Sequence, residues 1–229
     1  MLNFIGIGSA FNTDLGNTCA YFKIRNDLFL IDCGSTAFKQ LVDLKILNNV
    51  TNIFIAITHT HPDHVGSLGE FALYSYYILG KKLKIIFPDI PLITSFFDCQ
   101  GIRKHYYEIS DNLKVTKDVE LFFFPASHVD TIPCYSIYIK GNNKSIFYSG
   151  DSNSVSSFAI KGLQNGDIDL MYQDTCSLDY PGNPHLYIGN LALAIYPKLR
   201  HKIYCMHIDK DFDTLYAKKL GFNVVSLVK

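Results

Sequence analysis

The segment Thr58-His59-Thr60-His61-Pro62-Asp63-His64 places metal-binding imidazole and carboxylate groups directly after the apolar run 53–57. That run is apolar throughout and rich in β-branched residues, which predicts a buried strand. If the strand stays extended through His61, the side chains of His59 and His61 project to the same side. A turn at Pro62 then adds Asp63 and His64. Because these ligand types suit zinc and other divalent ions, we expect a metal site here, with further ligands from elsewhere in the chain.

The composition is that of an ordinary globular protein. The 229 residues are 48% hydrophobic and 18% charged, which predicts one large domain spanning 1–229, or at most two small ones. The formal net charge is zero, which disfavours long nucleic acids as partners. No apolar stretch approaches the roughly 20 residues of a membrane-spanning helix.

The amino terminus and the cysteines indicate a cytoplasmic protein. The first residues predict a strand rather than a signal peptide, and the six cysteines contain no C-x-x-C pair. We therefore expect reduced thiols, as in other cytoplasmic proteins. Cys205 precedes His207 by two residues and is expected to be a core thiol rather than a ligand.

Strand and helix patterns interleave along both halves of the chain, which predicts an α/β protein with layered sheets. The predicted strands are 2–7, 20–24, 28–31, 53–57, 83–87, 119–124, 134–139, 145–148, 168–172, 202–206 and 223–227, and the predicted helices are 36–47, 65–79, 91–99, 154–163, 187–199 and 212–220. A hairpin turn is expected at 141–143, and no internal repeat is visible. Residues 100–112 have no clear period and fit either a strand with flanking loops or a lid over a pocket.

Three further ligand candidates follow predicted strands, namely His128, Asp151 and His207. The order H-x-H-x-D-H, a lone His, Gly-Asp and a terminal His resembles the metallo-β-lactamase superfamily, which implies a four-layer αβ/βα sandwich. The resemblance implies two divalent ions, Zn²⁺ with Mn²⁺ as the alternative, held by His59, His61 and His128, by Asp63, His64 and His207, and by a bridging Asp151. Two such ions can generate a hydroxide at neutral pH and clamp the attacking and leaving oxygens.

Two further segments are similar to the ribonuclease Z-like branch of that superfamily. They are 5–10 with Gly16-Asn17-Thr18, and Asp174-Thr175 with His185, although Asp174 stands where the branch usually has Glu. The resemblance implies a homodimer in which His185 is catalytic, as a charge stabiliser or proton donor. Asp63 would orient the attacking hydroxide as well as ligate, and Asp174 would align His185. The alternative for His185 is an exposed loop residue.

The substrate implied by the resemblance is a small phosphodiester. Ribonuclease Z enzymes carry a long arm that grips transfer RNA, and residues 64–128 leave no room for one. A 3′,5′-cyclic nucleotide fits better, and small phosphodiesterases of this branch include the anti-Pycsar proteins. Three alternatives stay open: a transfer RNA 3′-endonuclease, a lactone or thioester hydrolase on the same metal site, and a non-catalytic metal-binding protein.

A basic and aromatic stretch offers candidate substrate contacts. Arg103, Tyr106 and Tyr107 would supply phosphate contact and base stacking. An amphipathic strand or a solvated loop explains the same residues equally well.

Overall fold

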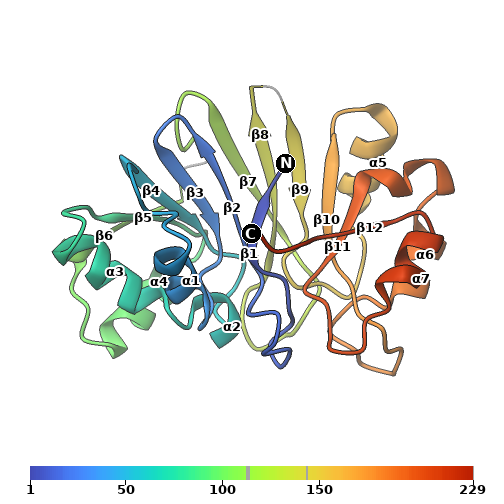
Figure 1. Ribbon diagram of the computed structural model, residues 1–229, viewed down its shortest axis with the longest axis horizontal. Coiled ribbons are helices and arrows are strands. Elements are labelled where there is room, and N and C mark those ends of the chain that lie inside the picture. The colour runs from blue at the N-terminus through green and yellow to red at the C-terminus, as the bar shows by residue number, and fades with distance from the viewer. Residues whose placement is uncertain (112–113, 143, 229) are drawn as a thin grey trace. The chain divides into compact units, whose positions relative to one another are not determined.

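The computed structural model describes residues 1–111, 114–142 and 144–228, and these form two compact units (Figure 1). Unit 1 comprises Met1–Asn112 and Leu227–Lys229, and unit 2 comprises Leu113–Ser226. The Val228 N–H donates to the Phe4 carbonyl over 2.9 Å, which ties the end of the chain to unit 1. Among the described residues, no helix combines the length and the apolar character needed to cross a membrane. The single domain spanning 1–229 stays a prediction.

Unit 1 is a six-stranded mixed sheet with helices beside it. Its strands, which lie in sequence order in the sheet, are β1 (Asn3–Gly6), β2 (Cys19–Ile24), β3 (Asp27–Ile31), β4 (Asn52–Ala56), β5 (Leu83–Ile86) and β6 (Tyr107–Ser110). Its helices are α1 (Ala37–Asp43), α2 (Pro62–Val65), α3 (Leu68–Tyr77), α4 (Ile90–Cys99) and the 3₁₀ helix η1 (Lys104–Tyr106). The first three strands are antiparallel and the rest parallel, and β3 to β5 are apolar runs buried in the core.

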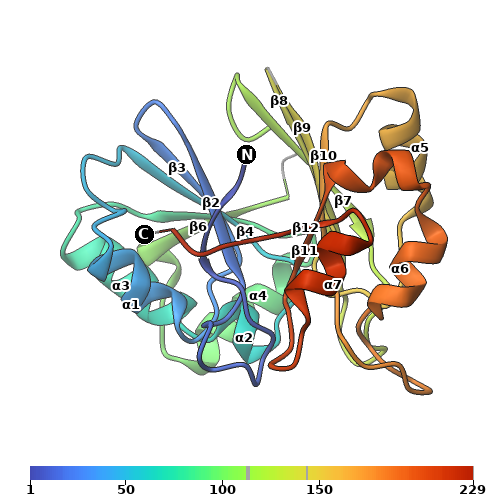
Figure 2. The same cartoon turned by 45° about the vertical axis from the view of Figure 1, so that its right-hand side comes forward.

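Unit 2 has the same strand order and directions as unit 1, a repeat that no sequence pattern predicted. Its strands are β7 (Val119–Pro125), β8 (Tyr135–Gly141), β9 (Ser145–Tyr148), β10 (Leu170–Asp174), β11 (Ile203–Met206) and β12 (Asn223–Val224). Its helices are α5 (Ser157–Asn165), α6 (Ile188–Ala194), α7 (Thr214–Lys219) and the 3₁₀ helix η2 (Pro197–Lys202). Strands β7 to β9 are antiparallel and β9 to β12 parallel. Figure 2 shows α5, α6 and α7 gathered along one side of β10, β11 and β12.

The predicted helix 187–199 is wrong in one respect, because it is two elements. Helix α6 ends at Ala194, and η2 begins at Pro197. Tyr196, which precedes the proline, has ψ of 134°. A proline cannot donate a helical hydrogen bond and keeps the preceding residue out of the helical region, so the chain breaks there.

Within the described residues, the stretch 100–112 contains a strand with flanking segments, the first of the two predicted alternatives. Helix η1 leads into β6, which pairs in parallel with β5 at the edge of the sheet of unit 1. The predicted hairpin of β8 and β9 is confirmed by their antiparallel pairing. Residues 112 and 143, which belong to these two predictions, lie outside the described residues.

Candidate metal centre and its supporting residues

The loop after β4 brings two predicted ligands together. Strand β4 ends at Ala56, close to the predicted end at Ile57, and does not extend through His61. His59 Nε2 nevertheless lies 2.9 Å from His61 Nδ1. Two nitrogen lone pairs at this distance repel each other unless a proton or a cation lies between them. At this distance the two nitrogens share either a proton, in a hydrogen bond, or a cation, so the loop brings the two predicted ligands into direct contact.

Helix α2 positions the other two predicted ligands of unit 1. Pro62 occupies its first turn, where a missing N–H costs nothing, and Asp63 and His64 follow in that turn. His64 Nε2 lies 3.3 Å from Asp63 Oδ2, and both side chains are largely buried. The predicted helix 65–79 corresponds to α3, which begins at Leu68, and α2 overlaps the prediction only at Val65.

Asp32, directly after β3, orients this loop although the sequence analysis missed it. Its buried carboxylate accepts hydrogen bonds from Thr58 N–H over 2.7 Å, from Thr58 Oγ1–H over 2.8 Å and from His64 Nδ1 over 2.8 Å. Thr58 Oγ1 in turn lies 3.0 Å from His59 Nδ1. These contacts hold both rings through Nδ1, as is common for histidines that ligate a metal through Nε2. Burial raises the pKa of Asp32, while His64 and Thr58 act in the opposite direction. A carboxylate directly after an apolar strand was the signal available in the sequence.

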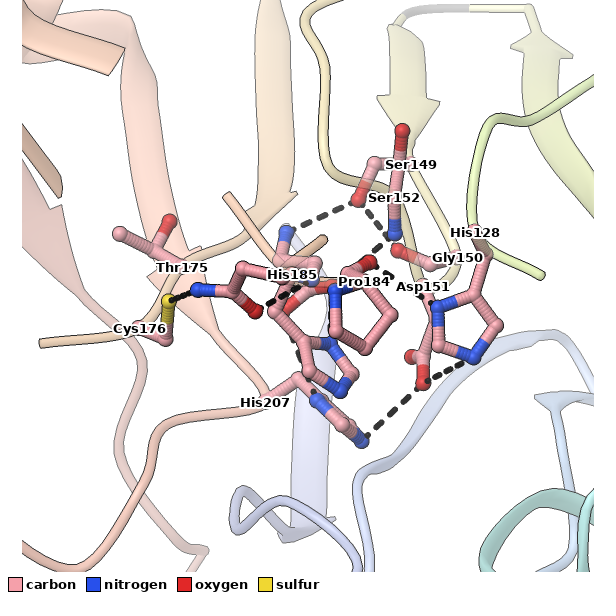
Figure 3. Close-up of polar contacts among 12 residues, drawn as sticks. His128, Ser149, Gly150, Asp151, Ser152, Thr175, Cys176, Pro184, His185 and His207 are labelled. Carbon is pink, nitrogen blue, oxygen red and sulfur yellow. Dashed lines mark hydrogen bonds and ion pairs between the residues drawn. The ribbon is translucent and has the colours of Figure 1, made fainter. Parts of the chain in front are cut away.

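The ligand candidates of unit 2 converge on one carboxylate. Figure 3 shows Asp151 between the rings of His128 and His207. Asp151 Oδ2 lies 3.7 Å from His128 Nε2 and 3.5 Å from His207 Nε2. Two donors about 2.1 Å from a tetrahedral zinc are about 3.4 Å apart, whereas hydrogen bonds are shorter. The donor set of unit 2 therefore fits a metal ion better than a hydrogen-bonded cluster.

The ring of His128 is fixed by the backbone. Its Nδ1–H donates to the Pro184 carbonyl over 3.0 Å, so its Nε2 faces Asp151. A histidine that ligates a metal commonly donates its other ring N–H to a carbonyl or carboxylate, which fixes its tautomer. The segment that contains Pro184 thus orients a predicted ligand.

His185 and Asp174 form a hydrogen-bonded pair beside these ligands. His185 Nδ1 lies 2.7 Å from Asp174 Oδ2, and Asp174 also accepts from Ser152 N–H over 2.9 Å. The His185 ring stacks on His207 with centroids 5.0 Å apart, and its side chain is 24% exposed rather than projecting into solvent. Burial lowers the pKa of His185, but the charge and the hydrogen bond of Asp174 outweigh burial, so the pKa lies above its ordinary value.

Residues in the left-handed backbone region mark three strand ends. Asp32 follows β3 with φ of 63°, Gly150 lies between β9 and Asp151 with φ of 60°, and His207 follows β11 with φ of 56°. Left-handed conformations are unfavourable for residues other than glycine and occur often at functional sites. His207 is itself a predicted ligand, Gly150 directly precedes the predicted ligand Asp151, and Asp32 is hydrogen-bonded to the predicted ligand His64.

The remaining sequence candidates divide between core and surface. Tyr107 is 3% exposed and stacks on Phe97 with centroids 4.1 Å apart, so the structure favours a packing role for it. Arg103 is exposed, and Tyr106 shares a 2.7 Å hydrogen bond with the Tyr77 hydroxyl. All six cysteines are free, and burial raises the pKa of Cys205 to about 12, as befits a core thiol.

The fold defines the class of protein. The structure of the metallo-beta-lactamase fold protein YhfI from Bacillus subtilis matches with a TM-score of 0.74 at 16% identity, over 100% of this chain and 95% of that one. The short form of human tRNase Z matches with a TM-score of 0.64 at 15% identity, over 98% and 95% of the two chains. The chain has the metallo-β-lactamase fold, and the predicted fold class, the αβ/βα sandwich, is confirmed.

Sequence comparison identifies the family. The profile described as "Anti-Pycsar protein Apyc1" matches residues 1–92 and 90–226. The chain belongs to this family and is a metal-dependent hydrolase. Anti-Pycsar protein Apyc1 of Paenibacillus harenae is 26% identical, with 98% of this chain and 96% of that one covered. The protein of the same name from Bacillus phage 010DV004 is 25% identical, with 95% and 92% covered.

Proposed function

We propose that the protein is a two-metal phosphodiesterase that hydrolyses a small phosphodiester, in the first place a 3′,5′-cyclic nucleotide. The observation that carries the proposal is the His185–Asp174 pair, a potential proton donor with its own carboxylate beside three predicted ligands. Cleavage of a phosphodiester needs a proton for the leaving oxygen, whereas hydrolysis of a lactone or thioester at a metal site does not require this pair. Membership of the Anti-Pycsar Apyc1 family supports the same substrate class.

The proposed ligand sets are those that the family resemblance implies. His59, His61 and His128 would hold one ion, Asp63, His64 and His207 the other, and Asp151 would bridge them. Mixed imidazole and carboxylate sets suit Zn²⁺ first, with Mn²⁺ as the alternative. The spacings of 3.3 Å between His64 and Asp63 and of 3.7 and 3.5 Å from Asp151 to His128 and His207 support this assignment.

The residues of the chain then have separate roles. When bound, two divalent ions lower the pKa of water and counter the charge of the phosphate. Asp63 would orient the attacking water oxygen toward phosphorus. As the bond between phosphorus and the leaving oxygen breaks, protonated His185 would stabilise the charge and give its proton to that oxygen. Asp174, hydrogen-bonded to His185 Nδ1, would keep Nε2 as the donating atom.

A cavity in unit 2 supports a substrate of modest size. Its volume is about 520 Å³, and its lining includes Ser127, His128, Asp130 and Pro184. This volume falls within the range of about 300–1,000 Å³ that is typical of pockets for small ligands. The cavity reaches His128, one of the predicted ligands.

Hydrolysis of a matched substrate panel tests the proposal. Purified protein of known metal content would be given 3′,5′-cyclic mononucleotides, bis-p-nitrophenyl phosphate, precursor transfer RNA, a lactone and a thioester. We expect turnover of cyclic mononucleotides that falls about 100-fold or more in His185→Ala and in Asp63→Ala. His201→Ala is the control, because His201 is exposed in η2.

Other outcomes of the panel contradict the proposal. Carbonyl turnover with silent phosphodiesters would assign the site to lactone or thioester hydrolysis, and cleavage of precursor transfer RNA would assign it to transfer RNA 3′ processing. The homodimer and the cytoplasmic location are part of the same proposal. Light scattering on the same preparation should give twice the chain mass of 25.9 kDa, and cell fractionation tests the location.

A further inference from the structure

The loop 177–186 of unit 2 is closed at its base and folded by its own sequence. The Cys176 N–H donates to the Leu186 carbonyl over 2.9 Å, and the Ile188 N–H donates to the Cys176 carbonyl over 3.0 Å. At the tip, Gly182 has φ of 79° and the Asn183 N–H donates to the Tyr180 carbonyl over 3.1 Å. Proline followed by a glycine of positive φ is typical of a type II turn, which directs the chain back into the loop at Asn183.

The side-chain amide of Asn183 makes hydrogen bonds within this loop through both its Nδ2 and its Oδ1 atoms. Its Nδ2 donates to the Leu178 carbonyl over 2.9 Å and lies 3.2 Å from Cys176 Sγ. Its Oδ1 accepts from the His185 N–H over 2.9 Å. An asparagine amide has two donors and one acceptor oxygen, and all three positions are engaged. Asn183 has no part in the proposed reaction, yet its side chain accepts a hydrogen bond from the backbone of His185.

The segment 183–185 supports two functional groups at once. The Pro184 carbonyl accepts a hydrogen bond from His128 Nδ1, and the His185 ring is hydrogen-bonded to Asp174. The Pro184 carbonyl and the His185 N–H belong to one planar peptide group, so the hydrogen bond from that N–H to Asn183 Oδ1 also holds the carbonyl in place. We propose that Asn183 is a positioning residue that sets, through this one segment, the orientation of both the ligand His128 and the proton donor His185.

Two measurements on Asn183→Ala test this inference, of which the second rests on the proposed function. The first is the affinity for Zn²⁺ alone, from competition with a chromogenic chelator, which needs no substrate. The second is kcat and KM for a cyclic mononucleotide at saturating Zn²⁺. We expect Zn²⁺ affinity to fall about 10-fold and kcat to fall about 10- to 100-fold, with KM changed less than about threefold.

Two further variants make the comparison specific. Asn190→Ala is the matched control, because Asn190 is an exposed asparagine in α6 of the same unit. Asn183→Asp is isosteric and keeps the acceptor for the His185 N–H, so it should retain more Zn²⁺ affinity and more kcat than Asn183→Ala. It also replaces Asn183→Ala if that variant fails to fold.

The outcomes separate the two proposals. If Asn183→Ala behaves like Asn190→Ala in both measurements, or loses only one of Zn²⁺ affinity and kcat, the inference is wrong. If the wild-type protein turns over no phosphodiester, the proposed function fails. The chelator competition then still tests whether Asn183 sets the orientation of His128.

Discussion

At the scale of single residues, a buried carboxylate that is not a proposed ligand organises the first ligand loop. Asp32 is 0% exposed and accepts hydrogen bonds from Thr58 and His64. A carboxylate on the far nitrogen of a ligating histidine fixes the ring and raises its basicity. The position of Asp32 therefore bears on metal affinity without direct contact with an ion.

We predict that Asp32→Asn weakens Zn²⁺ binding about 10- to 100-fold. The oxygen of the new amide still accepts from the Thr58 N–H. The NH₂ group that replaces Oδ2, however, can accept neither from Thr58 Oγ1–H nor from His64 Nδ1–H. Chelator competition measures the affinity. Asp43→Asn removes an exposed carboxylate paired with Lys39 and should change nothing. Equal affinities in the two variants would contradict the role of Asp32.

At the scale of elements, strand ends in the left-handed region aim the ligands. Gly150 lies between β9 and Asp151 with φ of 60°. Gly166 follows α5 with φ of 84°, and a Cβ there would meet nothing within 4 Å. The two glycines share the same backbone demand, but only Gly150 adjoins a proposed ligand.

We predict that Gly150→Ala and Gly166→Ala each destabilise the protein by about 1–2 kcal/mol, the cost of a left-handed residue with a side chain. For a protein of this size each kcal/mol lowers Tm by about 2–4 °C. Only Gly150→Ala should also weaken Zn²⁺ binding, because relief of its strain moves Asp151. Thermal unfolding without metal and chelator competition measure the two effects. A similar loss of Zn²⁺ affinity in Gly166→Ala would contradict the prediction, because it would show that backbone strain anywhere in the unit lowers the Zn²⁺ affinity.

At the scale of the whole molecule, the proposed ligand sets make stability depend on metal. An ion bound only by the native state stabilises it by about 2.7 kcal/mol at a free concentration 100 times Kd. In the proposed ligand sets, His59 and His128 hold the same ion. Removal of either one should therefore cost the same stabilisation.

We predict that a chelator lowers Tm of the wild type more than Tm of His59→Ala or His128→Ala. The double variant should lose no more than either single variant, because both residues act through one ion. Differential scanning fluorimetry with and without chelator measures the shifts. The exposed His201→Ala serves as the control and should behave like the wild type. Additive losses in the double variant would assign the two histidines to different ions.

Much of the fold and of the candidate site could be predicted because its signals are local. Apolar strand runs and the H-x-H-x-D-H spacing lie within short windows; the runs placed the strands along the chain, and the spacing supplied the ligand candidates. The helix break at Pro197 was also visible in the sequence, but helical spacing outweighed it in the prediction. The role of Tyr107 could not be predicted in this way. Only its stacking on Phe97, seen in the structure, shows that it is a core residue and not a surface residue available to a substrate.

By itself, the sequence determined the α/β class, the family resemblance and the set of candidate ligands, since residue type and spacing suffice for these. Only the tertiary structure decided which groups support those ligands. Asp32 reaches residues 26 and 32 positions away, and Pro184 reaches His128 from 56 positions away. The repeated topology of the two units likewise appears only in the strand pairing. The physical reason is that a hydrogen bond depends on distance in space, which folding brings about between segments whose local sequence patterns carry no record of each other.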